Sequence, residues 1–167
     1  MDFPKKIKVG ICLFCLVYSL QAQTSLATVQ LRNIKGKLVS FGSVSEKDSL
    51  ILVCFWATWS EASIQELNAI SANYQQWKTI ASFKLMAISI DEGKSANKIR
   101  PLVNLNGWLF DVYSDLNGDL RKELNSNNLP QALLIKRDKV VYQQSGFESG
   151  TENYLLQKIL AISTGGH

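Results

Sequence analysis

The sequence predicts an α/β protein with a central mixed β-sheet flanked by helices, and three observations lead to this prediction. Residues 51–56, ILVCFW, form a continuous apolar run that is typical of a strand buried on both faces. A helical pattern and a second apolar strand at 83–90 follow, so the order is β-α-β, which pairs two strands in parallel through a right-handed crossover. Residues 131–136 and 139–142 then predict an antiparallel hairpin. A sheet with parallel and antiparallel pairs is therefore expected.

The helix between the first two buried strands is predicted at about residues 60–77. Its apolar residues recur at steps of three and four and share one face, as Ile64, Leu67, Ile70, Tyr74 and Trp77. Two capping-box spacings occur at its start, Thr58-x-x-Glu61 and Ser63-x-x-Glu66, of which only one can be the cap. A strand that runs directly into a helix offers unpaired N–H groups and a positive dipole end, which favour an anion such as a thiolate.

The first buried strand is preceded by a predicted N-terminal β-hairpin. Val29 and Leu31 alternate with polar residues, residues 33–37 contain a glycine turn, and residues 38–41 form a second short strand. Residues 42–49 read as a polar connection.

Besides the hairpin at 131–142, three helices and one strand are predicted in the second half of the chain. A helix begins at Ser95 or Asn97 and is stopped by Gly107, and residues 108–113 form a short strand. A polar helix follows at 117–125. The chain closes with a helix at 152–162, whose apolar residues are Tyr154, Leu155, Ile159 and Leu160.

The N-terminal 23 residues have the pattern of a secretory signal peptide. Lys5, Lys6 and Lys8 precede an apolar run at 9–20, and Ala22 is a plausible cleavage point. The run is shorter than the roughly 20 apolar residues of a membrane-spanning helix. We therefore expect export to the periplasm or cell envelope and a single mature domain at 24–167. An uncleaved membrane tether is the alternative, and contact with a membrane is expected only in that case.

Composition and charge exclude some classes of partner. The chain has 167 residues, 46% hydrophobic and 19% charged, which is ordinary for a globular domain. Its net charge is +4, and this falls to +2 when residues 1–23, with three lysines and one aspartate, are removed. No basic cluster indicates binding to nucleic acid, so no such partner is expected.

The cysteines predict no disulfide. Cys12 and Cys15 lie in the apolar run of the signal peptide, which leaves Cys54 as the only cysteine of the mature chain. Cys54 is in the middle of the first buried strand, where a thiol has a raised pKa and is inert.

The segment Phe55-Trp56-Ala57-Thr58-Trp59, with Glu66-Leu67 after it, resembles the active-site segment of thioredoxin-like disulfide oxidoreductases. The similarity is greatest to the extracytoplasmic TlpA/ResA-type branch, and it covers nearly all of residues 29–162. It implies a thioredoxin-like fold with an N-terminal β-hairpin and an α/β insertion. In that family a Cys-x-x-Cys motif follows the tryptophan, whereas this chain has Ser60 and Ser63 at the two cysteine positions.

The two serines remove the expected dithiol chemistry. A thiolate attacks a disulfide sulfur, and a serine hydroxyl keeps its proton near neutral pH and cannot replace it. We therefore interpret Ser60 and Ser63 as inactive at the catalytic positions, with helix capping as their structural role. The only histidine, His167, lies in a Gly-Gly tail and provides no base for a catalytic serine.

Three further positions belong to the predicted site. Glu66 matches the family acid that tunes the thiol pKa, and it also reads as a first-turn acid favoured by the helix dipole. The resemblance places Leu129-Pro130 in a cis-proline loop opposite the active-site helix. In relatives the backbone before this proline pairs with an extended peptide. Trp59, Leu129 and Pro130 are accordingly predicted to bind peptide.

Two functional hypotheses follow, and neither needs a cofactor or a metal. The first is a secreted, redox-inactive thioredoxin-like protein that binds an extended peptide or a partner protein of the cell envelope. The alternative is a working envelope disulfide reductase of which this chain is a cysteine-to-serine form. Asp115-x-Asn117-x-Asp119 has the opening spacing of a calcium loop, but the glycine and the glutamate that the loop requires at its sixth and twelfth positions are absent.

Overall fold

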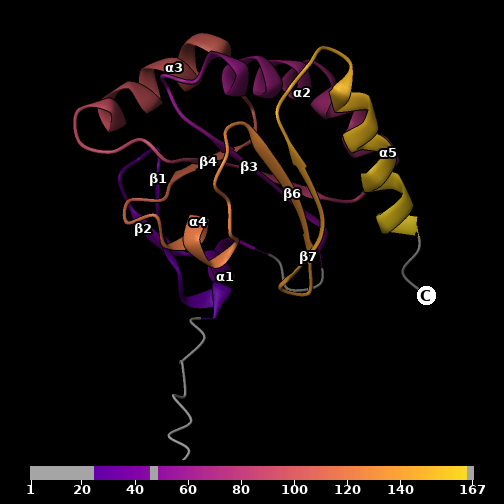
Figure 1. The fold of residues 1–167 in the computed structure, drawn as a ribbon, viewed down its shortest axis with the longest axis horizontal. Coiled ribbons are helices and arrows are strands. Elements are labelled where there is room, and N and C mark those ends of the chain that lie inside the picture. Colours follow the sequence, from indigo (N-terminus) through magenta and orange to yellow (C-terminus); the bar gives the residue numbers. More distant parts are fainter. Residues whose placement is uncertain (1–24, 46–48, 165–167) are drawn as a thin grey trace, which may run out of the picture.

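The computed structural model describes residues 25–45 and 49–164, so the predicted signal peptide lies outside the described residues. The described chain forms one seven-stranded mixed sheet of order β2-β1-β5-β4-β3-β6-β7 (Figure 1). The strands are β1 (Gln30–Asn33), β2 (Leu38–Ser40), β3 (Ile51–Trp56), β4 (Lys84–Ser89), β5 (Asp111–Ser114), β6 (Gln131–Lys136) and β7 (Lys139–Ser145). The helices are η1 (Leu26–Thr28), α1 (Phe41–Val44), α2 (Glu61–Ile80), η2 (Ser95–Lys98), α3 (Ile99–Asn106), α4 (Asp119–Glu123) and α5 (Thr151–Thr164).

The pairing of the strands confirms the predicted mixed sheet. β3 lies at the centre, parallel to β4 and antiparallel to β6, and β5 continues the parallel part beside β4. The N-terminal hairpin of β1 and β2 joins the sheet through antiparallel pairing of β1 with β5. Arg137 and Asp138 turn the chain between β6 and β7 with φ angles of 51° and 60°, as a tight hairpin turn requires.

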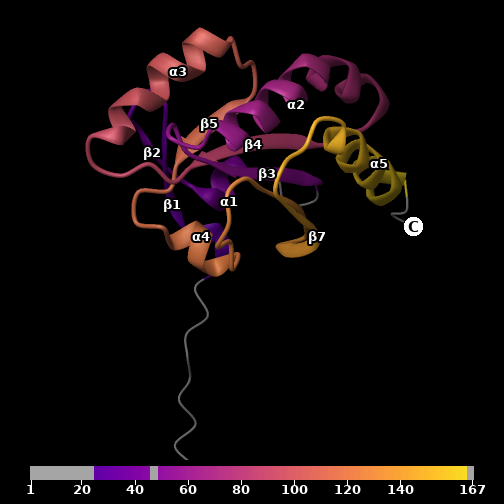
Figure 2. The same cartoon turned by 45° about the horizontal axis from the view of Figure 1, so that its top comes forward.

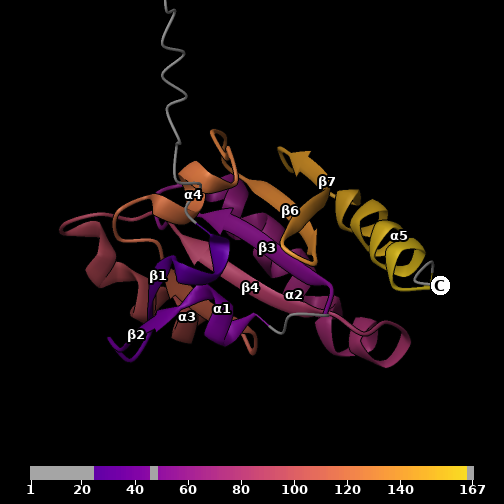
Figure 3. The same ribbon diagram turned by 90° about the horizontal axis from the view of Figure 1, so that it is seen from below.

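Helices cover both faces of the sheet, with α2, α3 and α5 on one face and α1 and α4 on the other (Figures 1 and 2). Every residue of β3 is buried, and successive side chains alternate between the two cores. Leu52, Cys54 and Trp56 face α2, whereas Val53 and Phe55 face α1 and α4. The view from below shows β3 and β4 at the middle of these layers (Figure 3). Burial on both faces explains why the strand has a continuous apolar sequence.

Several element boundaries differ from the prediction for local reasons. The second strand of the hairpin ends at Ser40, because Phe41 starts the short helix α1 and buries its ring completely. The predicted polar connection at 42–49 therefore contains the rest of that helix. The strand predicted at 108–113 begins only at Asp111, since Trp108 and Phe110 pack against the core from the preceding loop.

The helices differ from the prediction mostly at their ends. α2 extends three residues beyond Trp77, and α4 is shorter than the predicted 117–125. Gly107 ends α3 in the left-handed conformation with φ 64°, as predicted. In α5, Leu155 and Ile159 are buried, Leu160 packs against the same core, and Tyr154 is 63% exposed.

Candidate functional site at the start of α2

The candidate site lies where β3 ends and α2 begins. Ala57, Thr58 and Trp59 form the turn, and the backbone N–H of Ser60 donates to the carbonyl of Ala57 at 3.0 Å. Ala57 is fully buried, whereas Trp59 is 66% exposed, the largest exposure among the four tryptophans of the chain. The turn therefore presents one aromatic side chain to solvent directly before the helix.

Ser60 is the N-cap of α2, and neither capping-box spacing proposed from the sequence is used. The Oγ of Ser60 accepts a hydrogen bond from the backbone N–H of Ser63 at 3.4 Å. The two hydroxyl groups are also hydrogen-bonded to each other, with 2.7 Å between their oxygens. Ser63 is fully buried and Ser60 is half-buried. The two family cysteine positions are thus occupied by a hydroxyl pair at the positive end of the helix dipole.

Asp91 holds the turn from the neighbouring strand. Its carboxylate accepts from the backbone N–H of Thr58 and from the hydroxyl of Thr58, both at 2.7 Å, and from the hydroxyl of Ser89 at 2.8 Å. The hydroxyl of Ser89 in turn accepts from the backbone N–H of Asp91 at 3.0 Å. Asp91 and Ser89 are fully buried at the end of β4. This network ties the turn before Ser60 to the sheet.

Sequence reasoning did not assign a role to Asp91. The available signal was its position directly after a buried strand that pairs in parallel with β3, since such strand ends meet at one edge of the sheet. The sequence does not show that Asp91 accepts hydrogen bonds from the backbone N–H and the hydroxyl of Thr58.

Glu66 is buried one turn further along α2, on the same side of the helix as Ser63. Only 2% of its surface is exposed, and neither carboxyl oxygen has a hydrogen-bond partner among the described residues. Burial raises the pKa of Glu66 from 4.5 to about 8, because the charged form loses its hydration. The side chain is therefore mostly protonated at neutral pH. The predicted role of Glu66 as a first-turn acid is wrong, because α2 begins at Glu61 and the acidic residue of its first turn is Glu61.

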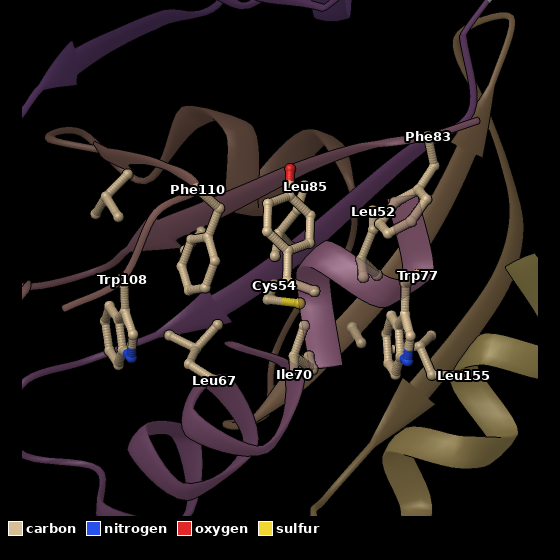
Figure 4. Packing of buried hydrophobic residues seen from close by; sticks show 14 of the residues in the cluster. Leu52, Cys54, Leu67, Ile70, Trp77, Phe83, Leu85, Trp108, Phe110 and Leu155 are labelled. Carbon is tan, nitrogen blue, oxygen red and sulfur yellow. The ribbon is translucent and has the colours of Figure 1, made fainter. Parts of the chain in front are cut away.

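Cys54 lies among apolar side chains between β3 and α2, close to Leu67 and Ile70 (Figure 4). Its thiol is fully buried, and its pKa is raised, first by burial and then by the negative charge that Glu66 carries when ionised. It is the free cysteine of the described chain. A thiol in this environment is a poor nucleophile.

The indole N–H of Trp56, on the same face of β3 as Cys54, is likewise buried without a hydrogen-bond partner among the described residues. Trp108 packs edge-on against it, with 5.0 Å between ring centroids, and donates its own indole N–H to Asn68 at 2.8 Å. The indole N–H of Trp56 and the carboxyl group of Glu66 are thus both buried without a hydrogen-bond partner in the described structure.

The predicted peptide-binding residues lie at the same edge of the sheet as the turn. Phe55 pairs with Gln131, so Pro130 precedes β6 beside the carboxyl end of β3. The Leu129–Pro130 bond is cis, Pro130 is buried, and its carbonyl accepts from the N–H of Gly146 at 3.0 Å. The N–H and carbonyl of Leu129 form no hydrogen bond with any residue that the structure describes.

Metal-binding potential is low in the described part of the chain, which contains no group of three or more His, Cys, Asp or Glu side chains placed to hold an ion. Asp115, the first residue of the rejected calcium loop, accepts instead from the backbone N–H groups of Leu120 and Arg121, at 3.3 and 2.8 Å. It thereby caps α4.

The strand, turn and helix at this site match a known family. The sequence matches the AhpC/TSA family over residues 22–144. The chain belongs to the AhpC/TSA family. A thioredoxin-like protein of Porphyromonas gingivalis is 33% identical, with a TM-score of 0.73, and the alignment covers 86% of this chain and 94% of that one. No curated protein matches the sequence. The predicted thioredoxin-like fold is confirmed.

More distant solved structures share the fold. The putative thiol:disulfide interchange protein DsbE of Chlorobium tepidum is 23% identical, with a TM-score of 0.67 and coverage of 79% of this chain and 90% of that one. The bacterioferritin comigratory protein of Xanthomonas campestris is 14% identical, with a TM-score of 0.69 and coverage of 83% and 94%. The chain thus shares its fold with a putative thiol:disulfide interchange protein and with a bacterioferritin comigratory protein.

Proposed function

We propose that this AhpC/TSA protein is an exported member of the TlpA/ResA-type branch that lacks dithiol chemistry and acts by binding an extended peptide or a partner protein of the cell envelope. The hydroxyl pair of Ser60 and Ser63 at the start of α2 carries the proposal. Disulfide exchange needs a thiolate at this position, and neither oxygen can replace it. Cys54, fully buried on the strand below, is not available as a substitute.

Binding of an extended peptide is supported by the surface beside this hydroxyl pair. Trp59 is largely exposed next to Ser60, and exposed aromatic side chains are frequent anchors at interfaces. The unpaired backbone of Leu129 can form main-chain hydrogen bonds with an added strand, a mode that requires no sulfur. Trp59, Leu129 and Pro130 would form the walls of the binding groove.

A peptide without free thiols tests binding separately from redox activity. The probe is a fluorescently labelled insulin B chain whose cysteines are alkylated, and the measurement is anisotropy during titration with the mature protein. We expect saturable binding that Trp59→Ala weakens by about tenfold, an effect typical of an interfacial tryptophan. Tyr154→Ala removes an equally exposed aromatic ring from α5 and is the matched control. Equal affinity for the two variants would remove Trp59 from the proposed site.

Redox inactivity is tested with native insulin and dithiothreitol. The chain should not accelerate reduction of insulin, and Cys54 should react with a thiol reagent only after denaturation. Turnover by the purified protein would contradict the proposal.

Export is proposed from residues 5–22, and N-terminal sequencing tests it. In an exporting host, the mature protein should begin near Gln23 or Thr24. Among the described residues no helix is sufficiently long and apolar to cross a bilayer. A protein that keeps Met1 and remains with membranes would favour the tether.

The alternative function, a disulfide reductase of which this chain is a cysteine-to-serine form, is favoured by Glu66. A buried carboxyl group without partners costs stability, and the raised pKa suits a proton donor or acceptor beside a thiol. Ser60→Cys with Ser63→Cys should therefore restore disulfide formation and insulin reduction without changing the fold. Introduced cysteines that neither pair nor react in a folded protein would contradict this relation to the reductases.

A further inference from the structure

A second candidate site is a cavity of about 180 Å³ at the same edge of the sheet as Ser60, beyond β5. It lies between the β1–β2 hairpin, the segment of η2 and α3, and the end of β5. Ser114 on β5 pairs with Ser89 on β4, which pairs with Trp56 on β3. Two strand spacings, about 10 Å, therefore separate the cavity from the turn at α2. Ligands of open α/β sheets bind along this carboxyl edge.

The alternation of β1 places Arg32 at this cavity. Leu31 is buried in the core on the side of α1 and α4, so Arg32 projects from the opposite face of the sheet, where α3 lies. Arg32 pairs with Ser114 in the sheet, and Arg100 in the first turn of α3 lines the cavity with them. Arg32 and Arg100, which are 68 positions apart in the sequence, thus each place a guanidinium group at this cavity.

These three polar side chains are unpartnered. Neither Arg32 nor Arg100 forms a hydrogen bond or ion pair with any residue in the described ranges, and the hydroxyl of Ser114 forms none there either. Both arginine side chains are exposed, whereas Ser114 is only 8% exposed and lines the cavity. An unpartnered hydroxyl between two unpartnered guanidinium groups is available to bind a ligand in the cavity.

Cationic residues are frequent in the segments that form the cavity. The hairpin and the segment from Lys94 to Arg100 carry six of them, of which Arg32 and Arg100 line the cavity. Among acidic residues, Glu92 precedes that segment, and Asp115, next to Ser114, accepts hydrogen bonds from the N–H groups of Leu120 and Arg121. The rest of the wall contains the apolar side chains of Ile34, Ile99 and Leu116 together with Asn33 and Asn97. The cationic residues are Arg32, Lys35, Lys37, Lys94, Lys98 and Arg100.

We propose that this cavity binds a carboxylate carried on a short aliphatic stem. Guanidinium groups match a carboxylate in two-pronged geometry, and Ser114 can donate a further hydrogen bond. The apolar wall suits the methylene groups of the stem and does not suit a fully hydrated inorganic anion. The volume is below the 300–1,000 Å³ of drug-sized pockets, so the ligand is a small aliphatic acid or a glutamate side chain of a bound polypeptide. This site is independent of the groove at Trp59.

Titration followed by NMR of backbone amides and arginine side chains tests the proposal. The two probes are glutarate and the blocked tripeptide acetyl-Ala-Glu-Ala-amide, with glutaramide and the Gln tripeptide as neutral counterparts. We expect saturable shifts at Arg32, Arg100 and Ser114 with the acidic probes alone. Tighter binding of the tripeptide would assign the site to a polypeptide, and tighter binding of glutarate would assign it to a free acid.

Substitutions then distinguish a built site from general attraction to a basic surface. Arg32→Gln and Arg100→Gln should each weaken binding by about tenfold or more, as for a lost charge-assisted hydrogen bond. Arg137→Gln makes the same change of charge at the β6–β7 turn and should leave the affinity unchanged. Ser114→Ala should also weaken binding, and it provides a second variant if an arginine variant does not fold.

Three results would overturn the proposal. They are the absence of saturable shifts with both acidic probes, equal shifts with the neutral probes, and binding that survives both arginine substitutions in a protein whose remaining spectrum is unchanged.

Discussion

Two buried carboxyl groups flank the turn between β3 and α2, and their surroundings are opposite. Asp91 is fully buried and accepts three hydrogen bonds, two from Thr58 and one from Ser89. Glu66 is nearly as buried, and neither of its oxygens has a partner in the described structure. Both carboxyl groups lie near this turn, and the difference in the hydrogen bonds that they accept indicates different roles. Asp91 stabilises the turn, whereas the buried carboxyl group of Glu66 costs folding energy.

The largest effect on stability that we expect from this contrast is that of Asp91→Asn. The amide nitrogen cannot accept a hydrogen bond, so at least one buried donor of Thr58 or Ser89 loses its partner. We expect the free energy of unfolding to fall by about 2–4 kcal/mol, measured by urea denaturation. Asp138→Asn is the matched control, because Asp138 is exposed in the β6–β7 turn and asparagine tolerates its φ of 60°. Equal effects of the two substitutions would show that the Asp91 network does not stabilise the turn.

The second prediction concerns the pH dependence that Glu66 gives to stability. Its pKa is about 8 in the folded protein, against an ordinary value of 4.5 for the unfolded chain, so the folded state binds the proton more strongly between these values. The contribution of Glu66 to stability is therefore fully present below pH 4.5 and is lost as the pH rises through 8. The loss should be about 2–5 kcal/mol by pH 9. Glu66→Gln should remove this slope and be more stable than the unmodified chain at pH 9.

Glu61→Gln is the control for that experiment, because Glu61 is exposed in the first turn of the same helix. It should leave the pH profile of the unfolding free energy nearly unchanged. A profile that is flat before any substitution would mean that water or rearrangement satisfies the buried carboxyl group.

The third prediction links the same contrast to thiol chemistry. In the background of Ser60→Cys with Ser63→Cys, Glu66→Gln should lower the apparent pKa of the introduced thiols by roughly one unit, because an ionised carboxylate nearby opposes the thiolate. Glu61→Gln should have a smaller effect, since water screens its charge. Thiolate absorbance against pH measures both. Identical titration curves for the two variants would show that Glu66 does not influence the pKa of thiols at positions 60 and 63.

The sequence predicts the fold well because the apolar patterns are local. The run at 51–56, the helical period from Ile64 to Trp77 and the β6–β7 hairpin each occupy a few consecutive residues, and all three are found. Boundaries fail where a tertiary contact decides them. Phe41 starts α1 instead of extending the hairpin, because its ring is buried in the core on the side of α1 and α4.

The sites were predictable only where one segment carries them. Ser60, Ser63 and Glu66 share a single motif, and their positions could be named without coordinates. The hydrogen bonds of Asp91 join residues 33 positions apart, and the cavity between Arg32 and Arg100 joins residues 68 positions apart. Such pairs depend on strand order, which a single sequence does not specify. The absence of partners for Glu66 likewise depends on everything that packs around it.

The smallest predicted effects on stability are those of the hydroxyl groups of Ser60 and Ser63 at the start of α2. Ser60→Ala removes the N-cap acceptor of α2 and should lower the free energy of unfolding by about 1 kcal/mol. Ser63→Ala should change it by less than about 0.5 kcal/mol, because the better helix propensity of alanine offsets the lost Oγ–Oγ hydrogen bond. Ser60→Asp keeps a capping oxygen and adds favourable charge at the helix N-terminus, so it should retain full stability. Urea denaturation of the three variants gives the order. If Ser60→Asp is as unstable as Ser60→Ala, the hydroxyl pair and not the cap stabilises the start of α2, and the serines would then have a structural role of their own.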